Sequence, residues 1–272
     1  MIIGISGKIS SGKDTVGSII QYLMDKNELR FTNLNTEEDF NSYMKNKHNL
    51  RCVWKIKKFA GKVKQIVSLL TGVSVEDLEK EEVKNSKLSD EWIRYGLADG
   101  FIKEYIGDGN MGNPKMINKQ CSKERYEEGL RISWQTSYKA HITYREMLQV
   151  VGTDLFRDKF HYDTWVNALF SDYIETPIVG SFDDNYSKWK TKYPNWIITD
   201  VRFPNELEAI KNRGGINIRV NRDTGTRAIN INPHSSETAL DDARFDYIID
   251  NNGSIEELIE KIKEILIKEK LL

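Results

Sequence analysis

The 272-residue chain has little cysteine and no excess of charge of one sign. Its two cysteines, Cys52 and Cys121, belong to no CxxC pair and have no histidines at the spacing of zinc ligands, which argues against a disulfide framework or a zinc site and indicates a reducing compartment. Lysine and arginine number 40 against 41 aspartate and glutamate, so the net charge of −1 provides no positive field for polymeric nucleic acid or an anionic membrane. We therefore expect a small molecule as the partner.

Long apolar runs and linkers are also missing. No stretch approaches the roughly 20 apolar residues that span a bilayer, and Gly4, Ser6 and Lys8 interrupt any apolar leader, so we expect a cytoplasmic protein without a membrane partner. No block rich in proline, glycine and serine divides the chain. We expect one domain over residues 1–272, with an insertion around 74–142 and a lid-like excursion around 221–243.

The first twenty residues, MIIGISGKISSGKDTVGSII, predict a strand, a loop and a helix. Gly7 and Gly12 bracket a small polar loop whose N–H groups can surround an anion, and the helix that begins near Lys13 points its positive end there. The spacing is that of a Walker A loop, although Asp14 stands where Ser or Thr is usual and Thr15 follows one position later. A plain Gly/Ser turn is the alternative, but the strand and helix context favours phosphate binding.

The rest of the chain predicts alternating strands and helices. Short apolar strands are expected within 52–59, 195–200, 216–220 and 245–250, and helices within 60–72, 143–160 with a break at Gly152, 163–174, 204–215 and after a capping box at 254–257. The polar stretch 35–49 indicates a loop or an exposed excursion, and 74–142 indicates helical insertions and long loops. This pattern predicts an α/β fold with a parallel sheet flanked by helices on both faces.

Ligands of such sheets bind beyond the carboxyl ends of the strands, which draws attention to Asp200. An acid that ends an apolar strand can hold Mg²⁺, directly or through water, beside a phosphate loop; alternatively, it caps the following helix. Arg202 and Glu206 follow it and would each be ordinary surface charges on their own.

A second group of candidates comes from a predicted helix. Arg145 and Gln149 share one helix face, and Arg157 and Trp165 follow. An arginine fork suits a phosphate, an amide can recognise a base edge, and an indole can stack on a base. The alternatives are a solvated helix face and a core tryptophan, which spacing alone would favour.

Three arginines, at positions 219, 222 and 227, cluster around the polar excursion that follows residue 220. A mobile flap with arginines is the device that closes over phosphates during transfer, and a charged loop is the alternative. The four histidines show no ligand spacing, so we expect no histidine-based chemistry.

Together these segments resemble the phage-type deoxynucleoside monophosphate kinases of the P-loop nucleoside monophosphate kinase superfamily. The residues that carry the resemblance are GKISSGKDT, KKFAGKVK, REMLQVVGTDLFR, DTWVNAL, ITDVRFPNELEAIKNRGG, IRVNR, HSSE and DYIIDNNGSIEEL. The resemblance is weakest over 74–142. It implies a P-loop kinase fold with a lid, located in the cytoplasm of a phage-infected host, that transfers a phosphoryl group from ATP to a deoxynucleoside monophosphate with Mg²⁺; a homodimer is compatible with it.

The resemblance also implies roles for individual residues. Those implied for ATP are Gly7, Ser11, Gly12, Lys13, Asp14, Thr15 and Asn251. Those implied for the monophosphate are Lys64, Arg145, Gln149, Gly152, Thr153, Arg157, Trp165, Asp200, Arg202 and Glu206. Catalytic roles fall on Lys13, Arg145, Arg157, Asp200 and the lid arginine Arg222, and Thr15 and Asp200 would hold the metal.

Other functions stay open at this level. Another small-molecule P-loop kinase, for example one acting on dephospho-coenzyme A or phosphomevalonate, would have a similar loop and lid. A nucleotide sensor or GTPase switch is less favoured because the chain has no Asn-Lys-x-Asp segment. A nucleic-acid-processing ATPase is disfavoured by the balanced charge.

Overall fold

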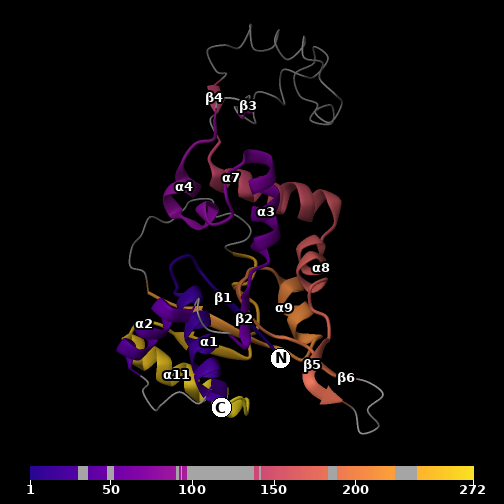
Figure 1. Cartoon of the computed structure of the whole chain (residues 1–272). Helices are drawn as coiled ribbons and strands as arrows, with labels where there is room; N and C mark the ends of the chain where they lie inside the picture. Colours follow the sequence, from indigo (N-terminus) through magenta and orange to yellow (C-terminus); the bar gives the residue numbers. More distant parts are fainter. Residues whose placement is uncertain are drawn as a thin grey trace. The chain divides into compact units, whose positions relative to one another are not determined.

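The computed structural model describes residues 1–29, 36–47, 52–89, 92, 94–96, 138–140, 142–182, 189–223 and 238–272 (Figure 1). The chain forms two compact units, which we describe separately. The first unit comprises Met1–Val63 and Leu155–Leu272, and the second comprises Lys64–Asp154. The single domain expected from the sequence remains a prediction.

The first unit contains a five-stranded sheet in the order β2-β7-β1-β8-β9. Its strands are β1 (Ile2–Gly7), β2 (Trp54–Lys57), β7 (Asn195–Val201), β8 (Ile216–Asn221) and β9 (Tyr247–Asp250). Every neighbouring pair in this sheet is parallel, which confirms the predicted parallel α/β sheet. Parallel pairing brings the carboxyl ends of the strands to one edge, where the candidate site lies.

Helices cover both faces of this sheet. Ile3 and Ile5 of β1 belong to one buried cluster with apolar side chains of α1 (Lys13–Leu29) and α11 (Ile255–Lys268). On the other face, a Cβ added at Gly4 would lie 2.6 Å from Cδ1 of Ile210 in α9 (Pro204–Lys211), so this helix packs where β1 has no side chain. Alternation along the strand therefore sends neighbouring residues to different helices.

One prediction within this unit is wrong. The stretch 35–49, expected as a loop or an exposed excursion, contains α2 (Glu37–Asn46), which begins with a capping box formed by Thr36 and Asp39. Phe40 is buried against the ring of Tyr22 at a centroid distance of 5.8 Å. Apolar residues at positions 40, 43 and 44 share one helix face and join the core, and this outweighs the polar composition of the segment.

A second difference concerns the helix expected over 143–160. Thr143 and Glu146 form the capping box of α7 (Tyr144–Gln149), and the chain continues directly as the π-helix η5 (Val150–Phe160). The expected break at Gly152 is therefore wrong: the helix changes its hydrogen-bond pattern at Val150 and passes through the glycine. The helix α8 (Thr164–Phe170) follows as predicted.

The second unit holds short elements outside the main sheet. The helix α3 (Ala60–Thr71) begins in the first unit and continues into the second, followed by η2 (Asp77–Glu79), α4 (Glu81–Asn85) and an antiparallel pair of β3 (Arg94–Gly96) and β4 (Tyr138–Ala140). Residues 97–137 of the expected insertion lie outside the described residues.

The first unit also contains an antiparallel pair that the sequence did not predict, formed by β5 (Thr176–Phe182) and β6 (Trp189–Lys192). Of the expected lid-like excursion, residues 224–237 lie outside the described part of the chain. Among the helices that are described, none is long and apolar enough to cross a membrane.

Candidate active site

The segment from the end of β1 to the first turn of α1, residues 7–15 and called the 7–15 loop below, has the backbone that a phosphate-binding loop requires. Ser10 and Gly12 adopt positive φ angles of 63° and 94°, and Ser11 N donates to Lys8 O at 3.2 Å. A Cβ at Gly12 would collide with Nδ2 of Asn251. Glycine is therefore required here for its conformation and for the close approach of a neighbour.

Lys13 is the first residue of α1, and its ammonium lies over this loop. Nζ donates to the carbonyl oxygens of Gly7 and Lys8, both at 2.7 Å. The positive end of α1 and the ammonium together favour an anion at this position. The structure thus gives the predicted loop the electrostatics that phosphate binding needs.

Asn251, expected near adenine, fastens the loop to the end of β9. Its Nδ2 donates to the carbonyl oxygen of Ser11 at 2.9 Å, and its backbone N–H donates to Asn221 O at 2.8 Å. Ser11 itself is buried, and its hydroxyl has no hydrogen-bond partner among the described residues. The contact of Asn251 with adenine and that of Ser11 with ATP remain predictions.

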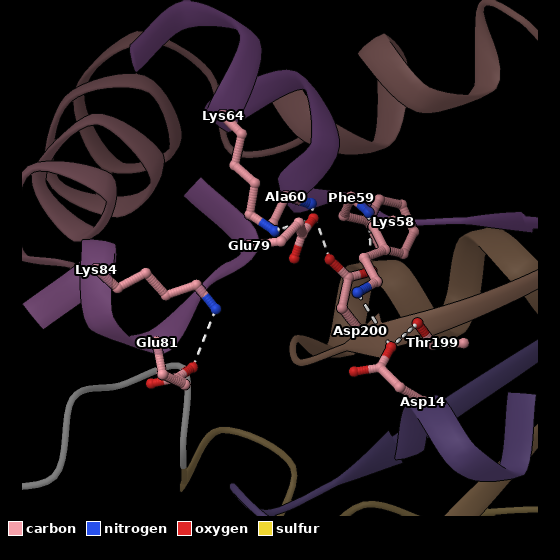
Figure 2. Close-up of polar contacts among 10 residues, drawn as sticks. All are labelled: Asp14, Lys58, Phe59, Ala60, Lys64, Glu79, Glu81, Lys84, Thr199 and Asp200. Carbon is pink, nitrogen blue, oxygen red and sulfur yellow. Dashed lines mark hydrogen bonds and ion pairs between the residues drawn. The ribbon is translucent and has the colours of Figure 1, made fainter. Parts of the chain in front are cut away.

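Asp14, the residue that departs from the usual Walker A pattern, has two partners, Lys58 directly after β2 and Thr199 of β7 (Figure 2). Its Oδ1 lies 3.1 Å from Nζ of Lys58 and accepts a hydrogen bond of 2.8 Å from the hydroxyl of Thr199. Desolvation opposes ionisation of this solvent-exposed carboxyl, but the charge of Lys58 and the two hydrogen bonds outweigh it and lower the pKa of Asp14. Asp14 is therefore an anion held in the first turn of α1.

Asp200 ends β7 and is buried, and its carboxylate caps a helix (Figure 2). Its two oxygens accept the backbone N–H groups of Phe59, at 2.8 Å, and Ala60, at 2.9 Å, so it caps α3 and not the following helix α9. Burial raises the pKa of Asp200, opposed by these two N–H donors and by the nearby charges of Arg202 and Lys58. Each oxygen keeps a lone pair beyond these bonds.

Glu206, four residues after Arg202, is buried in the first turn of α9. Its Oε2 accepts the backbone N–H groups of Arg202, at 2.7 Å, and Phe203, at 3.1 Å. Burial, reinforced by the charge of Asp200, raises the pKa of Glu206 to about 8, against the effects of those N–H donors and of Arg157. We call this group, comprising Arg157, Asp200, Arg202 and Glu206, the β7 corner.

Arg157 and Trp165 are both largely buried in the first unit. Trp165 of α8 packs against the ring of Phe156 at a centroid distance of 5.5 Å, which agrees with the alternative of a core tryptophan. Arg157 of η5 donates from Nη1 to Asn205 Oδ1 at 3.3 Å. Their contacts with a nucleotide remain predictions.

The other predicted acceptor residues lie in the second unit, so no common site with the β7 corner is described. Arg145 Nε donates to Asn85 Oδ1 at 3.0 Å, and its guanidinium also pairs with Glu81. Lys64 is buried and pairs with Glu79 at 2.5 Å (Figure 2). The remaining members, Gln149, Gly152 and Thr153, are half-buried where α7 passes into η5.

Thr15 and Arg222 complete the predicted set. Thr15 is half-buried in the first turn of α1, and Arg222 is exposed directly after β8. Within the described ranges, no cluster of three or more His, Cys, Asp or Glu residues could hold a metal by itself. Mg²⁺ in phosphoryl-transfer sites usually takes one or two protein ligands beside phosphates and water, and the hydroxyl of Thr15 and the carboxylate of Asp200 suit that donor set.

Sequence reasoning missed several residues around the loop. Lys58 and Thr199 hold Asp14, and Asp241 pairs with Lys8 of the loop and with Arg219 of β8. Lys58 and Thr199 could have been found from their position in the sequence, because both stand at the carboxyl ends of predicted strands.

A parallel sheet with a glycine loop, a loop lysine and charged residues at the carboxyl ends of its strands is consistent with a P-loop kinase. The family model of deoxynucleotide monophosphate kinases matches residues 1–262, and the chain belongs to this family. The protein is therefore a nucleotide kinase that phosphorylates deoxynucleoside monophosphates, as the sequence predicted.

Individual relatives agree with this assignment. The chain is 26% identical over 225 residues, or 78% of its length and 72% of the relative, to a deoxynucleoside-5'-monophosphate kinase of Escherichia phage T5. It is 31% identical over 122 residues to the deoxynucleotide monophosphate kinase of Enterobacteria phage T4, covering 45% of this chain and 44% of that one. A putative deoxynucleotide monophosphate kinase of Acanthamoeba polyphaga mimivirus is 32% identical over 127 residues, covering 44% of this chain and 59% of the relative.

Proposed function

We propose that the 7–15 loop holds ATP as the phosphoryl donor and that the acceptor monophosphate is held by residues of the β7 corner and of the helix containing Arg145. The observation that carries the proposal is the ammonium of Lys13, held 2.7 Å from two loop carbonyls at the positive end of α1. A triphosphate oxygen can replace those carbonyls and gain both the charge and the N–H donors of the loop.

For the donor, Gly7, Ser11, Gly12 and Lys13 supply the phosphate cradle. Lys13 neutralises charge on the γ-phosphoryl group, whose negative charge is spread over its oxygens in the transition state. Asp14 acts differently: as a fixed anion bound to Lys58 and Thr199, it holds the first turn of α1 against β7 and the end of β2.

For the metal, Thr15 and Asp200 would hold Mg²⁺, the former through its hydroxyl and the latter directly or through water. Bound Mg²⁺ supplies charge neutralisation on the phosphates. The carboxylate of Asp200 is already oriented by the N–H groups of Phe59 and Ala60, so its free lone pairs have a fixed direction.

For the acceptor, Arg145 and Arg157 offer guanidinium groups to a phosphate, and Gln149 and Trp165 offer an amide and an indole to the base. Lys64, Gly152, Thr153, Arg202 and Glu206 complete the proposed set, and Arg222 belongs to the lid. A monophosphate is already an anion, so the transfer requires alignment and charge neutralisation and no general base.

We also infer that the enzyme works in the cytoplasm of an infected host on free nucleotides and not on polymeric nucleic acid. The balanced charge of the chain supports the second point. A homodimer remains compatible with the sequence.

A coupled assay of ADP release tests the proposal across all common nucleoside and deoxynucleoside monophosphates. We expect release that depends on a deoxynucleoside monophosphate, on ATP and on Mg²⁺, with little release from ATP alone because closure excludes water. ADP release that is equally fast without any acceptor would overturn the proposed acceptor site.

A further inference from the structure

The guanidinium of Arg157 is buried, and although its charge acts on Glu206, its described ion pair is a long one. The residue is 8% exposed, and its one ion pair within the described part of the chain joins Nε to Asp158 Oδ1 at 3.8 Å. A buried charge is costly unless other groups stabilise it. Something other than Asp158 must therefore hold this side chain.

Two aromatic rings provide much of that stabilisation. Cζ of Arg157 lies 3.5 Å from the ring centroid of Phe203 and 4.2 Å from that of Tyr162. Phe203 is the N-cap residue of α9, and Tyr162 lies in the turn between η5 and α8. Arginine stacks well on ring faces, and the attraction is larger where water is excluded.

One amide sets the rotation of the guanidinium between these rings. Asn205 Oδ1 accepts from Nη1 of Arg157 at 3.3 Å, while its Nδ2 donates to Asp163 Oδ1 at 2.8 Å and to Tyr162 O at 3.3 Å. The same side chain thus orients the guanidinium and fastens the turn that carries Tyr162. The described contacts engage Nη1 and Nε of Arg157, which leaves Nη2 for an anionic ligand.

We propose that Tyr162, Phe203 and Asn205 are positioning residues that fix the Arg157 guanidinium for the phosphate of the acceptor. The proposal rests on the proposed function, which assigns Arg157 to the acceptor. It adds that the orientation of the Arg157 guanidinium is fixed before the nucleotide binds. Binding of the acceptor phosphate therefore does not include the entropy cost of ordering this long side chain.

The test compares Tyr162→Leu and Asn205→Ala with the wild type. Tyr162 is 51% exposed, so its ring can be removed without opening the core. We expect each variant to raise the acceptor KM, and the acceptor Kd measured by calorimetry, by roughly three- to tenfold, with the ATP KM unchanged. Tyr162→Phe keeps the ring and should restore the wild-type acceptor KM.

Tyr193→Leu is the matched control, because Tyr193 is 48% exposed and stacks on Tyr173 at a centroid distance of 5.0 Å, with no contact to Arg157 among those described. It should leave the acceptor KM unchanged even if it lowers the Tm. The proposal is overturned if Tyr162→Leu and Asn205→Ala change the Tm but not the acceptor KM.

Arg157→Ala separates the two levels of the argument. If it weakens acceptor binding while Tyr162→Leu and Asn205→Ala do not, the positioning role fails and the proposed acceptor site stands. If Arg157→Ala itself leaves acceptor binding unchanged, the assignment of Arg157 to the acceptor fails, and the positioning role fails with it.

Discussion

In the 7–15 loop, mainly backbone groups position the charged residue, whereas in the β7 corner buried side chains lie against one another. The loop positions Lys13 through two carbonyls and a glycine with positive φ, all within a short stretch of sequence. The corner brings together Arg157, Asp200 and Glu206, which are at most 8% exposed and come from two segments of the chain, around residue 157 and over 200–206.

This difference has consequences for pKa values and for tolerance to substitution. Asp14, in the 7–15 loop, has partners that lower its pKa, while burial raises the pKa values of Asp200 and Glu206. A substitution in the loop should therefore affect activity far more than stability. A substitution in the corner should affect both, because it leaves a buried group without its partner.

The largest expected effect is that of Lys13→Ala. The lysine charge is used most fully in the transition state, so we expect its removal to lower kcat by at least about a hundredfold with little change in Tm. Steady-state kinetics and thermal unfolding measure the two quantities. A well-folded variant with near-normal kcat would remove Lys13 from the mechanism.

Next in size are Arg145→Ala and Arg157→Ala. Loss of a charged hydrogen bond should lower kcat/KM for the acceptor by roughly tenfold to a hundredfold, that is by ~1.5–3 kcal/mol, with little change in ATP affinity. Lys84→Ala is the control for Arg145, since it removes the other cation paired with Glu81. An equal effect of Lys84→Ala would assign Arg145 a structural role.

The variant Glu206→Gln tests the β7 corner through the pH dependence of its stability. The pKa of Glu206 is raised from its usual 4.5 to about 8, so the folded state binds the proton more tightly than the unfolded chain does. The contribution of Glu206 to the free energy of unfolding is therefore fully present below pH 4.5. It is lost as the pH rises to about 8, by ~1.4 kcal/mol per pH unit at most.

Glutamine stays neutral, so Glu206→Gln should flatten this decline and unfold at a higher temperature than the wild type at pH 8.5, with little difference at pH 5. Glu208→Gln, an exposed change on the same helix, should leave the decline intact. Parallel pH profiles of Tm for the wild type and Glu206→Gln would contradict the assigned pKa.

Arg222→Ala should have the smallest effect. Arg222 is exposed after β8, and a lid arginine acts only on closure, so we expect a reduced kcat with ADP release still dependent on the acceptor. Arg244→Ala, another exposed arginine of the first unit, is the control. Unchanged turnover would reassign Arg222 to an ordinary surface charge.

Local signals explain which parts could be predicted from the sequence. The strand, loop and helix of residues 2–29 follow from apolar spacing and two glycines, and the structure has them. The helix α2 was missed because polar residues dominate its composition, although the Thr36–Asp39 cap and the spacing of Phe40 and Tyr43 were visible.

Long-range pairing explains the rest. That Asp200 caps α3 depends on β7 lying beside β2, a neighbour relation between strands more than 130 residues apart that no local pattern encodes. The surroundings of Arg157 likewise combine Tyr162, Phe203 and Asn205 from two segments. Asp200 and Arg157 could be identified as candidate site residues from the sequence, but their burial and their contacts could not be predicted.

Calorimetric titration of ATP and of each deoxynucleoside monophosphate, separately and into the wild type and Arg157→Ala, tests the central claim that donor and acceptor occupy separable sites. We predict that at least one deoxynucleoside monophosphate binds the wild type without ATP, and that Arg157→Ala weakens its binding roughly tenfold or more while ATP binding is unchanged. The claim is contradicted if no deoxynucleoside monophosphate binds, or if Arg157→Ala weakens ATP instead.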